Sequence, residues 1–402
     1  MSEHNTPVVI AARRTPISTR GMRLRSRSVH ELAAPVIRQC LADAERAIGS
    51  SIAVGDVVLG NCMGPGGNIA RLSALAANLD VSVPGMTIDR QCGSGLSAII
   101  TASNAISAGE CRLLLAGGAE SASTAPLRIA HGAPYLRAAF SPTGFPDPEM
   151  GPAAQDLAAV FGIDRDRQDA YAERSHRLAL VQLAVGGFDD ELVVLDELGR
   201  DDSPRERMTD LLPRFPSLYQ PVSGPTTGGP TLGAPTLGGQ TTGSVTAGNS
   251  CRISDGAAIV AIVSAGSRGD APGLALLAHA TIGCDPALPG IGPVAAVNGV
   301  LAAAGVSLDD IAAFEIVEAF AAQTLAVLYS LGLAARDFVD PRVCSGGGAL
   351  ALGHPWGASG AVSVVRLFTR LVREGAPAGS LGIATAAVGG GMGVAALFEV
   401  VR

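Results

Sequence analysis

The chain is poor in aromatic and in charged side chains, which make up 4% and 16% of its 402 residues. It also lacks any unbroken apolar stretch of the roughly 20 residues that cross a bilayer. Its first residues, MSEHNTPVVIAARRTP, have no apolar core of the kind that marks a signal peptide. These absences argue against a membrane protein and predict a soluble one.

The seven cysteines are odd in number and widely scattered, and the sequence has no C-x-x-C pair and no histidine cluster at zinc spacing. We therefore expect neither a disulfide framework nor a metal site. A chain of this length buries enough surface to be stable without disulfide or metal cross-links. Reduced thiols favour a cytoplasmic location.

A basic face is missing too, because the net charge is −7 and the acidic and basic residues are interspersed. Nucleic-acid binding needs such a face against phosphates and is not expected. One local exception is a basic segment, which we interpret as solvated surface and to which we assign no function: Arg13, Arg14, Arg20, Arg23, Arg25 and Arg27. Abundant Gly, Ala and Val favour closely packed layers and burial of surface between subunits.

Short β-branched runs alternate with Ala-rich helical stretches, which is the rhythm of an α/β fold. The runs begin at Pro7, Gly55 and Arg112, and the helical stretches include 29–48 and 168–184. Two distant segments share one pattern: QCGSGLSAIITASNAISAG before ECRLLLAGGAES, and GHPWGASGAVSVVRLFTRLVREG before SLGIATAAVGGGMG. This repeat predicts two similar α/β halves whose Gly-rich turns meet at a shared site.

Residues 121–244 break this rhythm with helices, prolines and polar turns, and we expect them to form a loop domain over the site. The N-terminal half would then be residues 1–120, completed by about 245–270, and the C-terminal half residues 271–402. Within the loop domain, residues 221–243 repeat PT-x-G and cannot bury enough apolar surface to order themselves. They are either a tolerated mobile insertion or a substrate lid.

Cys92 lies in the Gly-rich turn DRQCGSGL, directly before a helix of small residues. We expect the thiol to lie at the helix N-terminus, where the macrodipole favours the nucleophilic thiolate. A cysteine in such a turn needs a base. The best candidate is His354, because the glycines before it and the proline after it would fix an imidazole at a helix entrance.

The sequence resembles the thiolase family, which includes acetyl-CoA acetyltransferases and 3-ketoacyl-CoA thiolases. The resemblance covers nearly the whole chain and rests on independent motifs in the right order. They are QCGSGLSA, AGGAESAS, SVTAGNS, EAFAAQ, GGALALGHPWGASGA and VGGGMG. It implies a five-layer αβαβα fold with a loop domain, homodimers or homotetramers, and a coenzyme A thioester as substrate rather than any permanently bound cofactor.

Carried over by residue, the resemblance makes Cys92 the acylated nucleophile and His354 its base. The backbone N–H groups of Cys92 and Gly389 would form the first oxyanion hole. The resemblance also assigns four residues to the channel for the acyl group and pantetheine: Met150, Ala247, Cys251 and Phe320. Cys251 stands where the family has serine.

The sequence departs from the family at the site. Ala387 replaces the second catalytic cysteine, and a methyl group can neither give nor take a proton. Val317 replaces the asparagine that holds a water in the second oxyanion hole, and Glu149 replaces a histidine. Arg252 stands where glycine is usual. These losses affect carbon–carbon chemistry, whereas the parts that load Cys92 remain.

Three hypotheses follow. In the first, the enzyme loads an acyl group onto Cys92 and passes it to an acceptor that needs no base at position 387. In the second, it is an ordinary thiolase in which Glu149, Glu318 or a cysteine such as Cys344 replaces the lost acid and base. In the third, it is an acyl-CoA-binding pseudo-thiolase subunit; the retained Cys92 and His354 count against this hypothesis.

Overall fold

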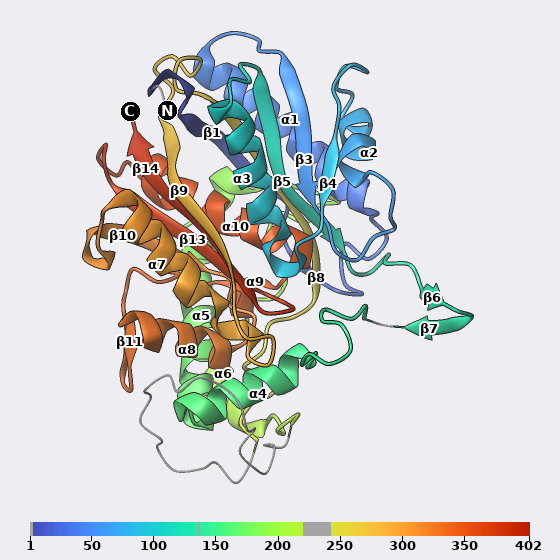
Figure 1. The fold of residues 1–402 in the computed structure, drawn as a ribbon, viewed down its shortest axis with the longest axis vertical. Coiled ribbons are helices and arrows are strands. Elements are labelled where there is room, and N and C mark those ends of the chain that lie inside the picture. The colour runs from blue at the N-terminus through green and yellow to red at the C-terminus, as the bar shows by residue number, and fades with distance from the viewer. Residues whose placement is uncertain (1–2, 136, 220–242) are drawn as a thin grey trace.

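The computed structural model describes residues 3–135, 137–219 and 243–402. Its largest feature is a ten-stranded sheet in the order β10, β13, β14, β9, β1, β8, β5, β3, β4, with β2 paired to β8 (Figure 1). The strands of this sheet are β1 (Pro7–Arg14), β2 (Ser18–Thr19), β3 (Val54–Gly60), β4 (Met86–Ile88), β5 (Leu113–Ser121), β8 (Ser254–Ser264), β9 (Gly273–Gly283), β10 (Ile311–Ile316), β13 (Leu381–Val388) and β14 (Met392–Val401).

The sheet has two parts with the same pairing pattern. In the N-terminal part β3 runs parallel to β5, which is followed by antiparallel β8 and β1. In the C-terminal part β10 runs parallel to β13, which is followed by antiparallel β14 and β9. Only two residue pairs between β1 and β9 join the parts, Val8 with Ala275 and Val9 with Leu274. The repeat seen in the sequence therefore corresponds to a repeated sheet topology.

Helices cover both faces of each part. They are α1 (Val29–Ile48), α2 (Ile69–Ala76), α3 (Ser94–Ser107), α4 (Met150–Phe161), α5 (Arg165–Ala184), α6 (Met208–Leu211), α7 (Gly292–Ala304), α8 (Ala321–Leu331), α9 (Ala349–Leu352) and α10 (Trp356–Phe368). Helices α3 and α10 pack against each other and contact strands of both parts, whereas α1 packs on the outer face of the first part and α7 on that of the second.

The alternation of side chains along β8 shows how these layers form. Ala258, Val260 and Ile262 belong to the central core with α3 and α10, and the intervening Ile259 and Ala261 belong to the outer core with α1. Both faces of the strand are thus buried, which explains its continuous apolar sequence. The resulting order of helix, sheet, helix, sheet and helix confirms the predicted α/β class and five-layer thiolase-like fold.

Gly118, in β5, lets this strand lie directly against the start of α10. A Cβ atom at this position would lie only 1.9 Å from the carbonyl oxygen of Gly357, so no side chain can be accommodated. This close approach brings the end of β5 next to the turn that carries His354.

The loop domain contributes α4, α5, α6 and the hairpin of β6 (Arg128–Ala130) and β7 (Ala133–Tyr135), which extends away from the body (Figure 1). A second small hairpin joins β11 (Ala334–Ala335) to β12 (Phe338–Val339). Helix α4 packs against α8 and α5 against α9. The predicted insertion, residues 221–243, lies outside the described residues except for Gly243, and the division at 120, 244 and 270 stays a prediction.

Across the described residues, no helix combines the length and the apolar character that crossing a bilayer requires.

Candidate active site

Cys92 lies in a single 3₁₀ turn, Gln91–Gly93, that leads directly into α3. Gln91 has a φ of 45°, a left-handed conformation that strains a residue with a side chain. Its carbonyl oxygen accepts hydrogen bonds from Ser94 Oγ at 2.7 Å and from Cys62 Sγ at 3.1 Å. These two contacts hold the strained turn, and the turn fixes the half-buried Cys92 thiol at the start of the helix.

His354 comes from the other half of the chain and meets Cys92. Its Nε2 lies 3.3 Å from Cys92 Sγ, and its Nδ1 lies 2.6 Å from Ser359 Oγ in α10. The Ser359 hydroxyl donates its hydrogen to the carbonyl oxygen of Pro355 at 3.0 Å, so its oxygen accepts from Nδ1–H. Nε2 therefore carries the lone pair that accepts the thiol proton of Cys92.

Burial leaves both partners uncharged at rest. It lowers the pKa of His354 to about 4. Burial also raises the pKa of Cys92 to about 12, with smaller contributions from the negative charges of Glu120 and Asp89. The expectation that the helix N-terminus favours the thiolate stays a prediction, and burial of the thiol acts in the opposite direction. The thiol must lose its proton to His354 as it attacks.

Glu120, at the end of β5, ties together the segments around this pair. Its buried carboxylate accepts hydrogen bonds from Asn61 Nδ2 and from three backbone N–H groups, those of Cys62, Met63 and Gly357. Gly357 lies in the first turn of α10, and the other donors follow β3. Burial raises the pKa of this carboxyl to about 7.

Residues 244–253 form a further segment at the site and run between α8 and His354. Cys251 N donates to the carbonyl oxygen of Ala319 at 3.0 Å, and His354 N donates to that of Arg252 at 2.8 Å. Ser250 forms an isolated bridge with Phe320. This segment therefore links the backbone ahead of α8 to the backbone of His354.

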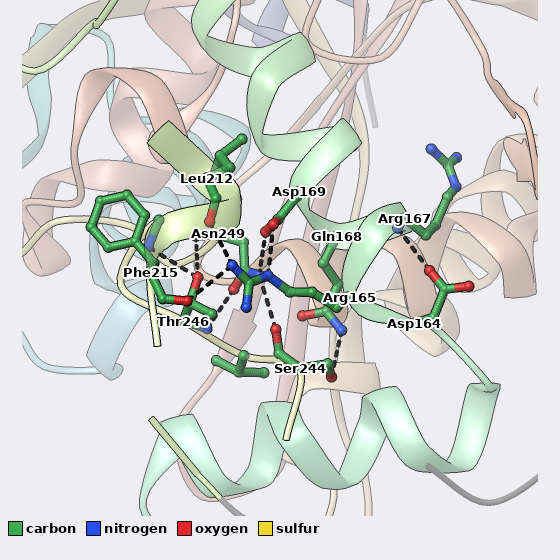
Figure 2. Close-up of polar contacts among 12 residues, drawn as sticks. Asp164, Arg165, Arg167, Gln168, Asp169, Leu212, Phe215, Ser244, Thr246 and Asn249 are labelled. Carbon is green, nitrogen blue, oxygen red and sulfur yellow. Dashed lines mark hydrogen bonds and ion pairs between the residues drawn. The ribbon is translucent and has the colours of Figure 1, made fainter. Parts of the chain in front are cut away.

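Helix α5 of the loop domain anchors the start of that segment (Figure 2). Gln168 Nε2 donates to Ser244 Oγ at 2.8 Å, and Asn249 Nδ2 donates to Asp169 Oδ1 at 2.8 Å. Arg165 pairs with the same aspartate and also donates to carbonyl oxygens of the 212–215 turn. The network holds Ser244–Asn249 rigidly between the loop domain and α8.

Two family models match the chain: the thiolase N-terminal domain over residues 7–266 and the thiolase C-terminal domain over residues 272–400. This chain belongs to the thiolase family. A Bacillus subtilis (strain 168) protein named "Putative acetyl-CoA C-acetyltransferase YhfS" is 39% identical over 98% of this thiolase and 99% of its own length. One from Staphylococcus haemolyticus (strain JCSC1435), "Putative acetyl-CoA C-acetyltransferase VraB", is 37% identical over 98% of both chains.

Among solved structures, the crystal structure of the Bacillus anthracis acetyl-CoA acetyltransferase is similar, with a TM-score of 0.83 and 32% identity. The match covers 98% of this thiolase and 99% of that chain. The matched domains and relatives make this thiolase an acyltransferase, for which a coenzyme A thioester is a substrate.

The four predicted channel residues differ in burial and in the element that carries them. Cys251 is half-buried. Burial raises the pKa of the Cys251 thiol, and the negative charge of a Cys92 thiolate raises that pKa further. Phe320 is half-buried ahead of α8, and Met150 starts α4, which packs on α8. Ala247 is exposed and lines a pocket of about 110 Å³. Their roles in binding stay predictions.

Two of the altered positions, Ala387 and Val317, lie on the C-terminal half of this thiolase. Ala387, 8% exposed, lies in β13 opposite Gly393. Val317 is buried, and its N–H donates to the carbonyl oxygen of Thr385 at 3.0 Å. Gly389 directly follows β13. The ring of Phe140 packs so closely against Gly389 that a Cβ atom added to this glycine would lie 2.7 Å from the ring. The role of Gly389 in an oxyanion hole stays a prediction.

Within the described ranges, none of the three substitute acid/base residues forms a hydrogen bond or ion pair with Cys92 or His354. Glu149 is exposed and pairs with Arg137 at 3.0 Å. Glu318 is fully buried and accepts hydrogen bonds from Tyr171 and Ser175 at 2.9 and 2.7 Å. Cys344 is buried and donates to the carbonyl oxygen of Ile316.

Neither Ser359 nor Glu120 was predicted from the sequence to be a site residue, although they lie in the motifs GGALALGHPWGASGA and AGGAESAS. Ser359 stands five residues after His354, and this spacing signals a hydroxyl one helical turn into α10. Glu120 is the lone acid in a run of small residues at a strand end, where a carboxylate must find donors.

Proposed function

We propose that Cys92 takes an acyl group from a coenzyme A thioester, with His354 as the base. The observation that carries this proposal is the 3.3 Å contact between Cys92 Sγ and His354 Nε2. The thiol proton moves to Nε2 as the sulfur forms a bond to the thioester carbon. The carbon–sulfur bond to coenzyme A then breaks, and the departing thiolate takes the proton from His354.

We propose further that the second half-reaction differs from that of a standard thiolase. The methyl group of Ala387 cannot remove a proton from an incoming carbon acid. The acceptor is then an amine, a hydroxyl, another thiol, or a carbanion made by decarboxylation. The positions of Glu149, Glu318 and Cys344 support this reading, because each is exposed or committed elsewhere.

The second candidate is ordinary acetyl-CoA C-acetyltransferase activity, the activity that the names of the relatives give. One observation favours it: Cys251 lies within electrostatic reach of Cys92. A thiol there could exchange a proton with a substrate carbon if its pKa fell on substrate binding. The third candidate, a pseudo-thiolase subunit, has no use for the retained pair of nucleophile and base.

One experiment separates the three candidates. The protein is incubated with acetyl-CoA and the mass of the peptide that contains Cys92 is measured; acetoacetyl-CoA and free coenzyme A are then supplied and thiolysis is followed. Acylation without thiolysis supports the altered second half-reaction. Acylation with thiolysis supports the ordinary thiolase, and neither reaction supports the pseudo-enzyme.

A companion variant restores the family residues. Ala387→Cys combined with Val317→Asn should raise thiolysis at least about 100-fold, the rate effect typical of one general acid or base. Ala387→Ser with Val317→Asn is the matched control, since a hydroxyl is too weak an acid for this role. Equal thiolysis in both double variants would count against the altered half-reaction.

The remaining parts of the proposal rest on composition and resemblance. We propose that the protein is cytoplasmic and a homodimer or homotetramer, and that its division into two halves and a loop domain follows the predicted boundaries. Met150, Ala247, Cys251 and Phe320 are proposed to line the channel for the acyl group and pantetheine.

A further inference from the structure

The pocket of about 110 Å³ beside Ala247 is lined by cationic side chains. Arg205 and His176 come from the loop domain, and Arg252 and Ser250 from the segment next to His354. Met208 and Leu350 contribute apolar walls. The pocket thus lies between the loop domain and the catalytic segment.

The positive charges in this pocket have no partner among the described residues. Neither the Arg205 nor the Arg252 side chain makes an ion pair or a side-chain hydrogen bond there. The residues outside the description, 1–2, 136 and 220–242, contain no Asp or Glu that could neutralise them. The carboxylate of Asp202 acts on the pKa of Arg252 only from a distance, and it already accepts hydrogen bonds from Ser18 and Thr19.

The unpaired charges repel one another. Burial lowers the pKa of Arg252, and the charge of Arg205 lowers it further. Burial likewise lowers the pKa of His176 to about 4, with the two arginines adding to the effect. Arg205 is exposed and Arg252 is half-buried, so an anion between them would be attracted by both charges.

The pocket adjoins the catalytic pair through the backbone. The carbonyl oxygen of Arg252 accepts the N–H of His354 at 2.8 Å, and the preceding residue, Cys251, lies within reach of the Cys92 charge. The pocket lining and the surroundings of the catalytic pair therefore share one continuous stretch of chain, residues 250–252. Resemblance to the family places glycine at position 252, so this guanidinium is a feature of the present chain.

We propose that Arg205 and Arg252 bind an anionic group, phosphate or carboxylate, of the thioester substrate. A guanidinium donates two parallel N–H groups to such an anion. The inference rests on the proposed function, because it assumes that the thioester reaches Cys92. The anion is either a phosphate of coenzyme A or a carboxylate at the far end of the acyl group.

The test compares Arg252→Ala and Arg205→Ala with the wild-type protein in single-turnover loading of Cys92. The substrates are acetyl-CoA, acetyl-dephospho-CoA, succinyl-CoA, butyryl-CoA and the uncharged acetylpantetheine. Each variant should raise the half-saturating concentration of the anionic thioester about tenfold or more and leave that of acetylpantetheine unchanged. Arg252→Lys should recover part of the loss.

The control is Arg207→Ala. Arg207 lies two residues from Arg205 and is exposed like it, but it pairs with Asp210 and does not line the pocket. It should behave as wild type. A loss that depends on the coenzyme phosphates identifies them as the anion, and a loss larger for succinyl-CoA than for butyryl-CoA identifies the acyl carboxylate.

The inference is overturned if both variants match Arg207→Ala with every anionic thioester, or if acetylpantetheine loading falls equally. Acetylpantetheine also separates the anion site from the proposed acylation of Cys92, since transfer of its acetyl group to Cys92 needs no anion site. If no thioester acylates the wild type, the proposed function fails, and calorimetry with pyrophosphate and succinate then tests the pocket alone. Binding to the wild type that is lost in Arg252→Ala would support the anion site, and no binding to the wild type would refute it.

Discussion

At the scale of single residues, the chemistry depends on a neutral thiol and a neutral imidazole in contact. The nucleophile could be predicted from the Gly-rich turn around Cys92, and the base from the proline and glycines around His354. Their charge state could not be predicted, because it depends on burial by segments distant in sequence. The tautomer of His354 likewise required the position of Ser359.

The pKa of His354 leads to a prediction about pH. Because burial lowers that pKa to about 4, the imidazole remains an unprotonated base well below neutral pH. The rate of Cys92 loading at about pH 5.5 should therefore stay within about twofold of its value at about pH 7.5. Single-turnover loading at subsaturating acetyl-CoA measures this directly. A histidine with its ordinary pKa of about 6.5 would instead give a loss of roughly tenfold.

Ser359 is a positioning residue, and its removal should act through His354. Ser359→Ala deletes the oxygen that accepts Nδ1–H, so the imidazole loses its fixed tautomer. We expect loading to fall about tenfold or more, with little change in the half-saturating thioester concentration. Ser359→Thr, which keeps a hydroxyl, should retain more activity. Equal activity in all three proteins would remove Ser359 from the mechanism.

At the scale of elements, the site forms where the ends of β3 and β5 meet the starts of α3 and α10. The repeat in the sequence predicted two similar turns, and the pairing of β3 with β5 and of β10 with β13 shows the same pattern. That Glu120 links these elements could not be predicted, since its donors come from segments about 60 and 240 residues away.

Glu120→Ala tests this link. The substitution leaves one buried and two part-buried backbone N–H groups without an acceptor, so the free energy of unfolding should fall by about 3 kcal/mol. Glu120→Gln keeps the shape and one acceptor oxygen, and we expect a smaller loss. Denaturant titration measures both. A change below about 1 kcal/mol in the alanine variant would mean that the carboxylate is not needed to hold these elements.

At the scale of the whole molecule, a buried ionic cluster joins parts that are distant in the chain. Arg14, at the end of β1, pairs with Glu191 and Asp201 of the loop domain, and Arg366 of α10 pairs with the same glutamate. Both guanidinium groups lie over the ring of Phe188. The interpretation of Arg14 as solvated surface is therefore wrong: its acidic partners lie about 180 residues away, where the sequence gives no sign of pairing.

Glu191→Ala should destabilise the whole fold, because it leaves two buried arginines short of a counter-charge. We expect a loss of about 3 to 5 kcal/mol in the free energy of unfolding. Glu173→Ala is the control, since Glu173 forms a partly exposed pair with Arg177 and should change stability by less than about 1 kcal/mol. Similar values for the two variants would contradict the role of the cluster.

The central claim is that the substrate becomes covalently attached to Cys92, and rapid-quench mass spectrometry after mixing with acetyl-CoA tests it most directly. The account predicts that the Cys92 peptide gains one acetyl group as free coenzyme A appears, that His354→Ala slows this step at least about 100-fold, and that Cys92→Ser abolishes it. Release of coenzyme A with Cys92 unmodified, or acetylation at another residue, would contradict the account.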